Sequence, residues 1–114
     1  MAVRVEPSRD EVIAFRLGAH QLSERLPEPG LLDAAGRCAV QDSPPGSALL
    51  ALHARVRGVT ADGLESALAD KSLLQTWSLR GAPFCFPTAD APVYTTGALP
   101  PTEEAGRHFL PGVV

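Results

Sequence analysis

Residues 47–87 read SALLALHARVRGVTADGLESALADKSLLQTWSLRGAPFCFP, and this stretch decides the fold. Up to Leu68, apolar residues recur every three or four positions, which is typical of helices that bury one face. After Lys71 the spacing shortens to two, which is typical of strands. The stretch therefore predicts two helices followed by a β-hairpin.

The two helices are delimited by capping residues and a short Gly-Val turn. Ser47 is expected to cap the first helix, which should stop at Gly58, and Thr60 is expected to cap the second. The residues expected to be buried are Leu49, Leu52 and Val56 in the first helix and Leu64, Ala67 and Leu68 in the second.

The predicted hairpin has its turn at residues 80–83, with Phe84, Cys85 and Phe86 on the returning strand. On the outgoing strand Leu74, Thr76 and Ser78 alternate with Gln75, Trp77 and Leu79. Aromatic residues on strands usually anchor small domains, so we expect Trp77 in the core. A base-stacking platform is the alternative for this side chain.

A further helix is expected upstream, because Ser8 and Glu11 form a capping box. It should run from Arg9 to Pro27 with its apolar stripe against the core; the stripe comprises Val12, Phe15, Ala19, Leu22 and Leu26. A short helix is expected near residues 31–36, and Thr88 and Thr102 are expected to cap two more.

Together these elements predict an α+β, mostly helical domain: a winged helix-turn-helix with a β-hairpin wing on its C-terminal side. A chain of 114 residues, 45% hydrophobic, suits one domain over residues 1–114. The start of the chain lacks the apolar block of a secretory signal, which favours a cytoplasmic protein. Arginine far outnumbers lysine, which suggests a bacterial source. Cys38 and Cys85, with His20, His53 and His108, lack zinc-ligand spacing, so neither a metal nor another cofactor is expected.

Two blocks of this sequence resemble a known family. The run AVQDSPPGSALLALHARVRGVT from Ala39, followed by the segment with Thr76, Trp77, Arg80 and Gly81, is similar to the winged-helix DNA-binding family that includes AlkZ-like DNA glycosylases. The resemblance covers roughly residues 8–110. It implies that the domain is the N-terminal part of a longer architecture with several winged-helix units.

The resemblance also points to candidate catalytic residues. In AlkZ-like glycosylases two glutamines flanking an apolar residue position water beside the N-glycosidic bond. Here the first glutamine position is Ala39, and Gln41 and Asp42 remain. Loss of one orienting amide favours a noncatalytic unit. The structural alternative is that Gln41 and Asp42 close turns by bonding to nearby backbone groups.

Charge limits how the chain can bind DNA. The net charge is −3, with a pI near 5.5. Residues 60–71, in the recognition position, carry three acids against Lys71, a net charge of −2. Arg55, Arg57 and Arg80 are therefore the candidate DNA-backbone contacts. We expect double-stranded DNA as the partner, bound with the help of further domains or of self-association, and no membrane.

The sequence leaves three candidate functions open. The first is a noncatalytic DNA-binding winged-helix module. The second is a DNA glycosylase acting on alkylated or cross-linked bases with the altered motif. The third is a protein-interaction or dimerisation module that uses apolar residues near the C-terminus, namely Phe109, Leu110, Val113 and Val114.

Overall fold

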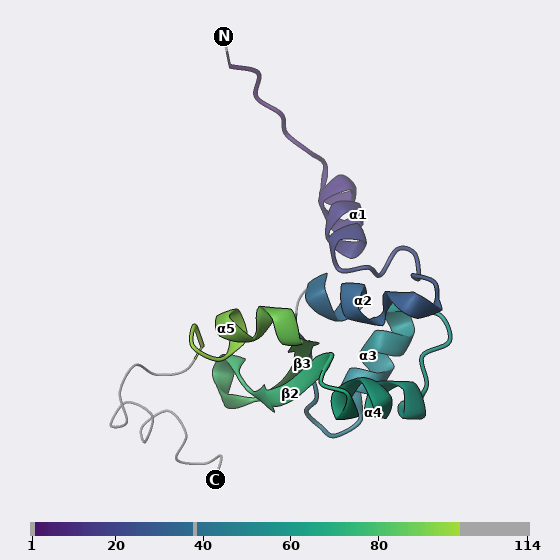
Figure 1. Cartoon of the computed structure of the whole chain (residues 1–114). Helices are drawn as coiled ribbons and strands as arrows, with labels where there is room; N and C mark the ends of the chain where they lie inside the picture. Colours follow the sequence, from purple (N-terminus) through teal and green to yellow (C-terminus); the bar gives the residue numbers. More distant parts are fainter. Residues whose placement is uncertain (1, 38, 99–114) are drawn as a thin grey trace.

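The computed structural model of the chain describes residues 2–37 and 39–98 (Figure 1). Its helices and strands are, in chain order, α1 (Arg9–Ala19), α2 (Leu31–Arg37), β1 (Val40–Gln41), α3 (Ser47–Arg55), α4 (Ala61–Ala69), β2 (Leu73–Trp77), β3 (Pro83–Pro87) and α5 (Ala91–Tyr94). Short 3₁₀ turns are η1 (Glu28–Gly30), η2 (Leu79–Gly81) and η3 (Thr88–Asp90). The order from α2 to β3 is that of a winged helix, which confirms the predicted fold class.

The sheet has three antiparallel strands in the order β1-β3-β2. β2 and β3 form the predicted hairpin, with Leu74 opposite Phe86 and Trp77 opposite Pro83. β1 adds to the other edge of β3 through the pairs Val40–Cys85 and Gln41–Phe84. Because side chains of paired residues point to the same side, this register divides the sheet into two faces.

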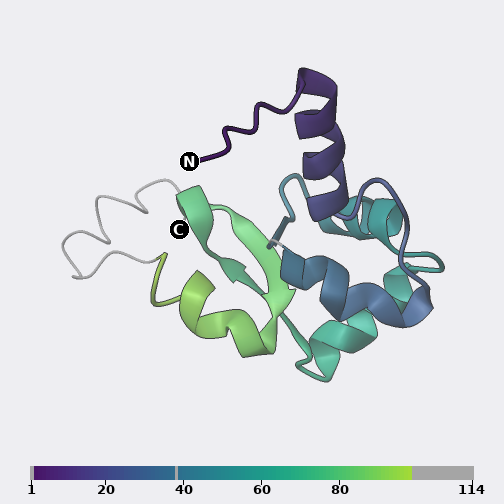
Figure 2. The same ribbon diagram turned by 90° about the horizontal axis from the view of Figure 1, so that it is seen from above.

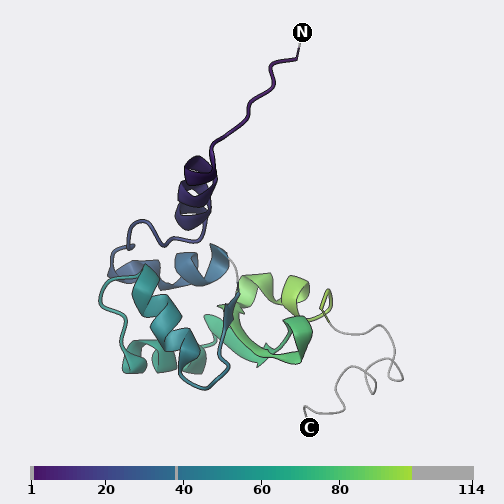
Figure 3. The same cartoon turned by 180° about the vertical axis from the view of Figure 1, so that it is seen from behind.

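Each face of the sheet is covered by helices (Figures 1 and 3). One face packs on α2, α3 and α4 to form the core, which comprises Ala34, Ala35, Val40, Ala48, Leu52, Val56, Ala67, Leu73 and Cys85. On the other face Phe84 and Phe86 are buried, and Phe86 stacks on Tyr94 of α5 with ring centroids 4.9 Å apart. The hairpin is therefore held from both sides.

The N-terminal helix starts as predicted but packs differently. Ser8 and Glu11 make both hydrogen bonds of the capping box. The expectation that the apolar stripe of α1 faces the core is wrong, since no residue of α1 is buried and Phe15 is 76% exposed. The helix projects from the edge of the body (Figures 1 and 2). The first helix of the three-helix core is instead the short α2.

α1 also ends earlier than expected, at Ala19 rather than at Pro27. Gln21 adopts a left-handed conformation with φ 59°, and the amide of Leu22 donates to the carbonyl of Leu17 at 2.8 Å. This is a Schellman closure, which usually employs glycine or asparagine. A glutamine in that position gives no signal that a helix stops there.

The boundaries of α3 and α4 are partly as predicted. The prediction that Ser47 caps α3 is wrong: Gly46, with φ 96°, holds the cap position, and the Ser47 hydroxyl donates to the carbonyl of Pro44. α3 ends at Arg55 rather than Gly58 because Val56 turns to extended backbone. Thr60 caps α4 as expected, accepting from the amide of Gly63 at 3.0 Å.

Two expectations near the hairpin are also wrong. Trp77 is not in the core, because its side chain is 45% exposed. Thr88 does not cap a helix but starts η3, and its hydroxyl donates to the carbonyl of Lys71. The predicted cap at Thr102 and the apolar residues near the C-terminus lie outside the described residues.

Among the helices of residues 2–37 and 39–98, none combines the length and apolar character that crossing a bilayer requires.

Candidate nucleic-acid interface

The two positions of the glutamine motif lie close together, because Gln41 is in β1 and Ala39 directly precedes that strand. Ala39 and Gln41 alternate with buried Val40, so they share the face of the sheet that α5 covers. The amide of Ala39 donates to the hydroxyl of Tyr94 at 3.3 Å. A phenol therefore stands beside Ala39, the position to which the resemblance assigns the first glutamine. Sequence reasoning missed Tyr94, because only the packing of α5 brings it there.

Gln41 contacts the wing. The Nη2 of Arg80 donates to the Oε1 of Gln41 at 3.4 Å, across 39 residues of sequence. Arg80 lies in η2 with a left-handed φ of 58°, so the hairpin turn carries its side chain toward β1. Among the described residues, the amide nitrogen of Gln41 makes no hydrogen bond. Among residues 2–37 and 39–98, the oxygen of this side chain is therefore bonded and its nitrogen is not.

Asp42 is fully engaged in holding the fold. Its Oδ1 accepts from the amides of Gly46 at 3.0 Å and Ala48 at 3.1 Å, which satisfies two free donors at the start of α3. Its Oδ2 accepts from the Nε2 of Gln75 on β2 at 2.8 Å. The bonds to Gly46 and Ala48 are the bonds to nearby backbone groups that the structural alternative expected for Asp42, and the bond to Gln75 also ties α3 to the hairpin. Among the described residues, Gln41 makes no such bond to the backbone.

Arg55 and Arg57 lie at the other end of α3. The Nε of Arg55 donates to the carbonyl of His20, and its Nη1 donates to the carbonyl of Ala51. Arg25 donates likewise to the carbonyls of His53 and Val56, so these guanidinium groups hold the segment after α1 against α3. Arg57 is exposed. The structure thus brings Gln41, Asp42 and Arg80 together, but not Arg55 and Arg57.

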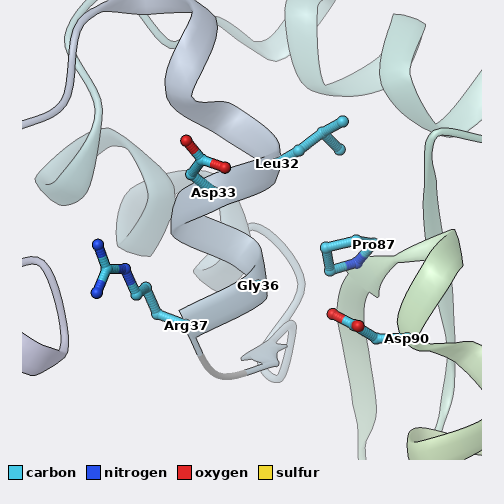
Figure 4. A pocket seen from close by; sticks show the side chains of 6 residues that line it. All are labelled: Leu32, Asp33, Gly36, Arg37, Pro87 and Asp90. Atoms are coloured by element: carbon cyan, nitrogen blue, oxygen red, sulfur yellow. The ribbon is translucent and has the colours of Figure 1, made fainter.

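A shallow groove of about 550 Å³ separates α2 from the end of β3 (Figure 4). Its lining includes two carboxylates, Asp33 and Asp90, together with Arg37. In Figure 4 the Arg37 side chain points away from Pro87 and Asp90. The Asp33 side chain likewise points away from Pro87 in Figure 4, so the charged group that faces the groove is the Asp90 carboxylate, which is unsuited to a phosphate.

The helix in the recognition position is also acidic. α4 and its ends expose Asp62, Glu65 and Asp70. The pKa of Asp70 is lowered because its carboxylate accepts hydrogen bonds from Ser72. Within the part of the chain that the structure describes, no three histidine, cysteine or acidic side chains gather as they would around a metal ion.

The basic wing, rather than α4, is the part of the winged helix suited to a phosphate backbone. Between Lys71 and Ala89 the sequence contains no acidic residue, and its two cations are Lys71 and Arg80. Arg80 is exposed at the hairpin turn. Because charge of one sign on a protruding turn attracts an oppositely charged polymer, the wing and the adjoining Gln41 form the candidate interface.

Comparison with known proteins identifies the family of this chain. Among solved structures, the Streptomyces sahachiroi DNA glycosylase AlkZ is similar at 27% sequence identity and a TM-score of 0.70. The match covers 91% of this chain and 29% of that chain, so this chain spans less than a third of the length of that protein. Comparison with curated proteins gave no match. A family model described as DNA glycosylase AlkZ-like matches residues 34–111, which is more than half of the chain. The protein therefore belongs to the AlkZ-like DNA glycosylase family.

Proposed function

We propose that this chain is a DNA-binding winged-helix unit that has no catalytic activity of its own. The observation that carries the proposal is the state of the motif on β1. Ala39 lacks the amide of the family's first glutamine, and both oxygens of Asp42 are occupied by the fold. What remains accessible beside Gln41 is the guanidinium of Arg80, which suits a phosphate.

The distribution of charge supports an approach to DNA through the wing. The acidic side chains of α4 repel phosphates, whereas residues 72–89 carry one charged side chain, the cation Arg80 at the hairpin turn. Arg80 is the first proposed backbone contact. Arg57 is a second, because it is exposed, and Arg55 contributes less because two of its nitrogens already donate to carbonyls.

We further propose that this unit acts as the N-terminal part of a longer architecture with several winged-helix units. Support comes from the match to AlkZ, because the matched region makes up 29% of the AlkZ chain. A net charge of −3 on the unit is consistent with weak binding that other domains or a second copy would strengthen.

Fluorescence anisotropy with an end-labelled duplex tests the binding proposal. We expect weak, salt-dependent binding whose slope of log affinity against log salt reflects about two phosphate contacts, that is, a slope near −2. Arg80→Ala should reduce the magnitude of this slope by about 1. Arg4→Ala makes the same change of charge at a side chain paired with Glu6 and serves as the control. Absence of binding at low salt would refute the proposal.

A DNA glycosylase is the second candidate, favoured by family membership and by the amide nitrogen of Gln41, which has no hydrogen-bond partner in the part of the chain that the structure describes. That donor and the nearby hydroxyl of Tyr94 are groups that hold water, and an alkylated, cationic base leaves readily once water is placed. A single-turnover assay on alkylated DNA compares the wild type with Gln41→Ala. Release of base above background that depends on Gln41 would establish the enzyme and exclude the noncatalytic proposal.

A further inference from the structure

Most of the exposed apolar surface lies at the start of the chain. Of the eleven large apolar side chains that are exposed among residues 2–37 and 39–98, six belong to residues 2–22, which we call the N-terminal arm. They are Val3, Val5, Ile13, Phe15, Leu17 and Leu22. Figures 1 and 2 show α1 projecting from the edge of the body, so the body does not cover this surface.

The composition of α1 is that of a covered helix. From Val12 to Ala19 it reads VIAFRLGA, in which Arg16 is the only charged residue. A helix that is apolar around most of its circumference is normally buried. In α1 only Val12 is half-buried, and every other residue is exposed. Because a helix of this length is marginal in water by itself, a partner that covers α1 removes apolar surface from water and also stabilises the helix.

The N-terminal arm carries both a protrusion and a hollow. The protrusion is Phe15, whose side chain is 76% exposed. Beside it lies a hollow of about 420 Å³, lined by Pro7, Glu11, Val12, Phe15 and Arg16. Since a cavity of about 150 Å³ accepts benzene, this hollow has room for the ring of a second phenylalanine. A surface that supplies both halves of a contact can pair with a copy of itself across a twofold axis.

The charge of the N-terminal arm also suits a second copy. The arm carries three basic and three acidic side chains, so its net charge is zero, whereas that of the whole chain is −3. Two arms therefore do not repel each other, and a neutral arm does not attract the phosphates of DNA. At the hollow itself one acid and one base, Glu11 and Arg16, are present together. Charge thus favours a second arm over a nucleic acid as the occupant.

The apolar area of the N-terminal arm is sufficient for a weak dimer. A symmetric pair brings together twelve large apolar side chains, six from each copy. At roughly 100 Å² of exposed surface each, they supply about 1,200 Å², which is the lower limit for a specific protein–protein interface. An interface at this limit gives a dissociation constant on the order of 100 µM.

We propose that two copies of this chain pair through their N-terminal arms, with Phe15 of each copy in the hollow of the other. This contact goes beyond the proposed DNA binding and does not depend on it. At concentrations well below the dissociation constant the chain is monomeric, and α1 is exposed as Figure 1 shows it. A dimer also joins two DNA-binding units, and linked units bind one duplex more tightly than either unit does alone.

Sedimentation equilibrium at protein concentrations from roughly 5 µM to about 1 mM tests the pairing. We expect the apparent mass to rise with concentration from 12.0 kDa, the mass of one chain, toward twice that value. The mass of one chain at every concentration would overturn the proposal. It would leave the proposed DNA binding standing, because anisotropy measures that binding on dilute protein.

Substitutions separate the N-terminal arm from the rest of the surface. Phe15→Ala should weaken the pairing about tenfold or more, because a buried aromatic side chain at the centre of a contact carries much of its binding free energy. Phe15→Leu keeps an apolar side chain and a good helix former, so it should weaken the pairing less. Leu50→Ala serves as the control, because Leu50 is 72% exposed on α3, and it should leave the pairing unchanged. Circular dichroism of each variant verifies that the fold is intact.

Hydrogen–deuterium exchange locates the contact on the chain. In the wild type, the amides of α1 should exchange more slowly at the highest protein concentration than at the lowest, and Phe15→Ala should abolish this difference. A dimer that Phe15→Ala leaves as tight as the wild type would overturn the proposal. So would a slowing of exchange confined to the wing or to α5, since the copies would then meet elsewhere.

Discussion

Replacing Asp42 by alanine is expected to destabilise the protein by roughly 2 kcal/mol. Loss of a capping side chain costs about 1 kcal/mol, and loss of an intramolecular hydrogen bond to a side chain costs a further 0.5–1.5 kcal/mol or so. Asp42 supplies both, since Oδ1 accepts from two amides at the start of α3 and Oδ2 accepts from Gln75. Asp42→Asn keeps an oxygen for the cap and loses the favourable interaction of its charge with the helix dipole, so it should cost only about 0.3–1 kcal/mol.

Urea denaturation followed by circular dichroism at 222 nm measures both values. Glu65→Ala, an exposed acid within α4 that makes no hydrogen bond among the described residues, is the control and should change the free energy of unfolding by less than about 0.5 kcal/mol. If Asp42→Ala were as stable as this control, the carboxylate would not be a structural cap. Asp42 would then become available for catalysis, and the argument for a noncatalytic unit would lose its main support.

Three further predictions concern two core residues and one residue of α1. Leu52→Ala should reduce the free energy of unfolding by about 3–5 kcal/mol, because Leu52 is fully buried among the three helices, and denaturation measures it. Phe15→Ala should leave the melting temperature unchanged in calorimetry, because Phe15 is exposed; a marked loss would show that α1 packs on something. Burial, and secondarily the charge of Asp42, raises the pKa of the Cys85 thiol from 9.0 to about 11. The thiol therefore contributes its full share of the folding free energy below pH 9, and this share is lost as the pH rises toward 11. In a Cys38→Ala background, native Cys85 should not react with a thiol reagent at pH 8, and rapid reaction would contradict its burial.

Local signals in the sequence predicted much of the fold. The capping box of Ser8 and Glu11 and the cap at Thr60 involve residues three apart, so a short stretch contains all the information. The hairpin was likewise predicted from the alternation of strand residues around its turn. The structure confirms the predicted order of helices followed by a hairpin.

The sequence is less informative about contacts between residues that lie far apart in the chain. A stripe of apolar residues shows that α1 is amphipathic but does not identify what lies opposite. Residue type predicts that Trp77 lies in the core, whereas the helices cover only the first part of β2. The carboxylate that caps α3 comes from Asp42, on the far side of a proline-rich turn. Nor do sequence patterns indicate that Arg80 reaches Gln41 or that Tyr94 reaches Ala39.

Because α1 is exposed, it should unfold locally before the rest of the domain does. An isolated helix of eleven residues is marginal in water, and the capping box is the main local stabilisation that α1 has. Its opening therefore costs little free energy compared with unfolding of the body. In hydrogen–deuterium exchange its amides should lose protection orders of magnitude sooner than those of α3. Limited proteolysis should remove the first twenty residues and leave the winged helix intact.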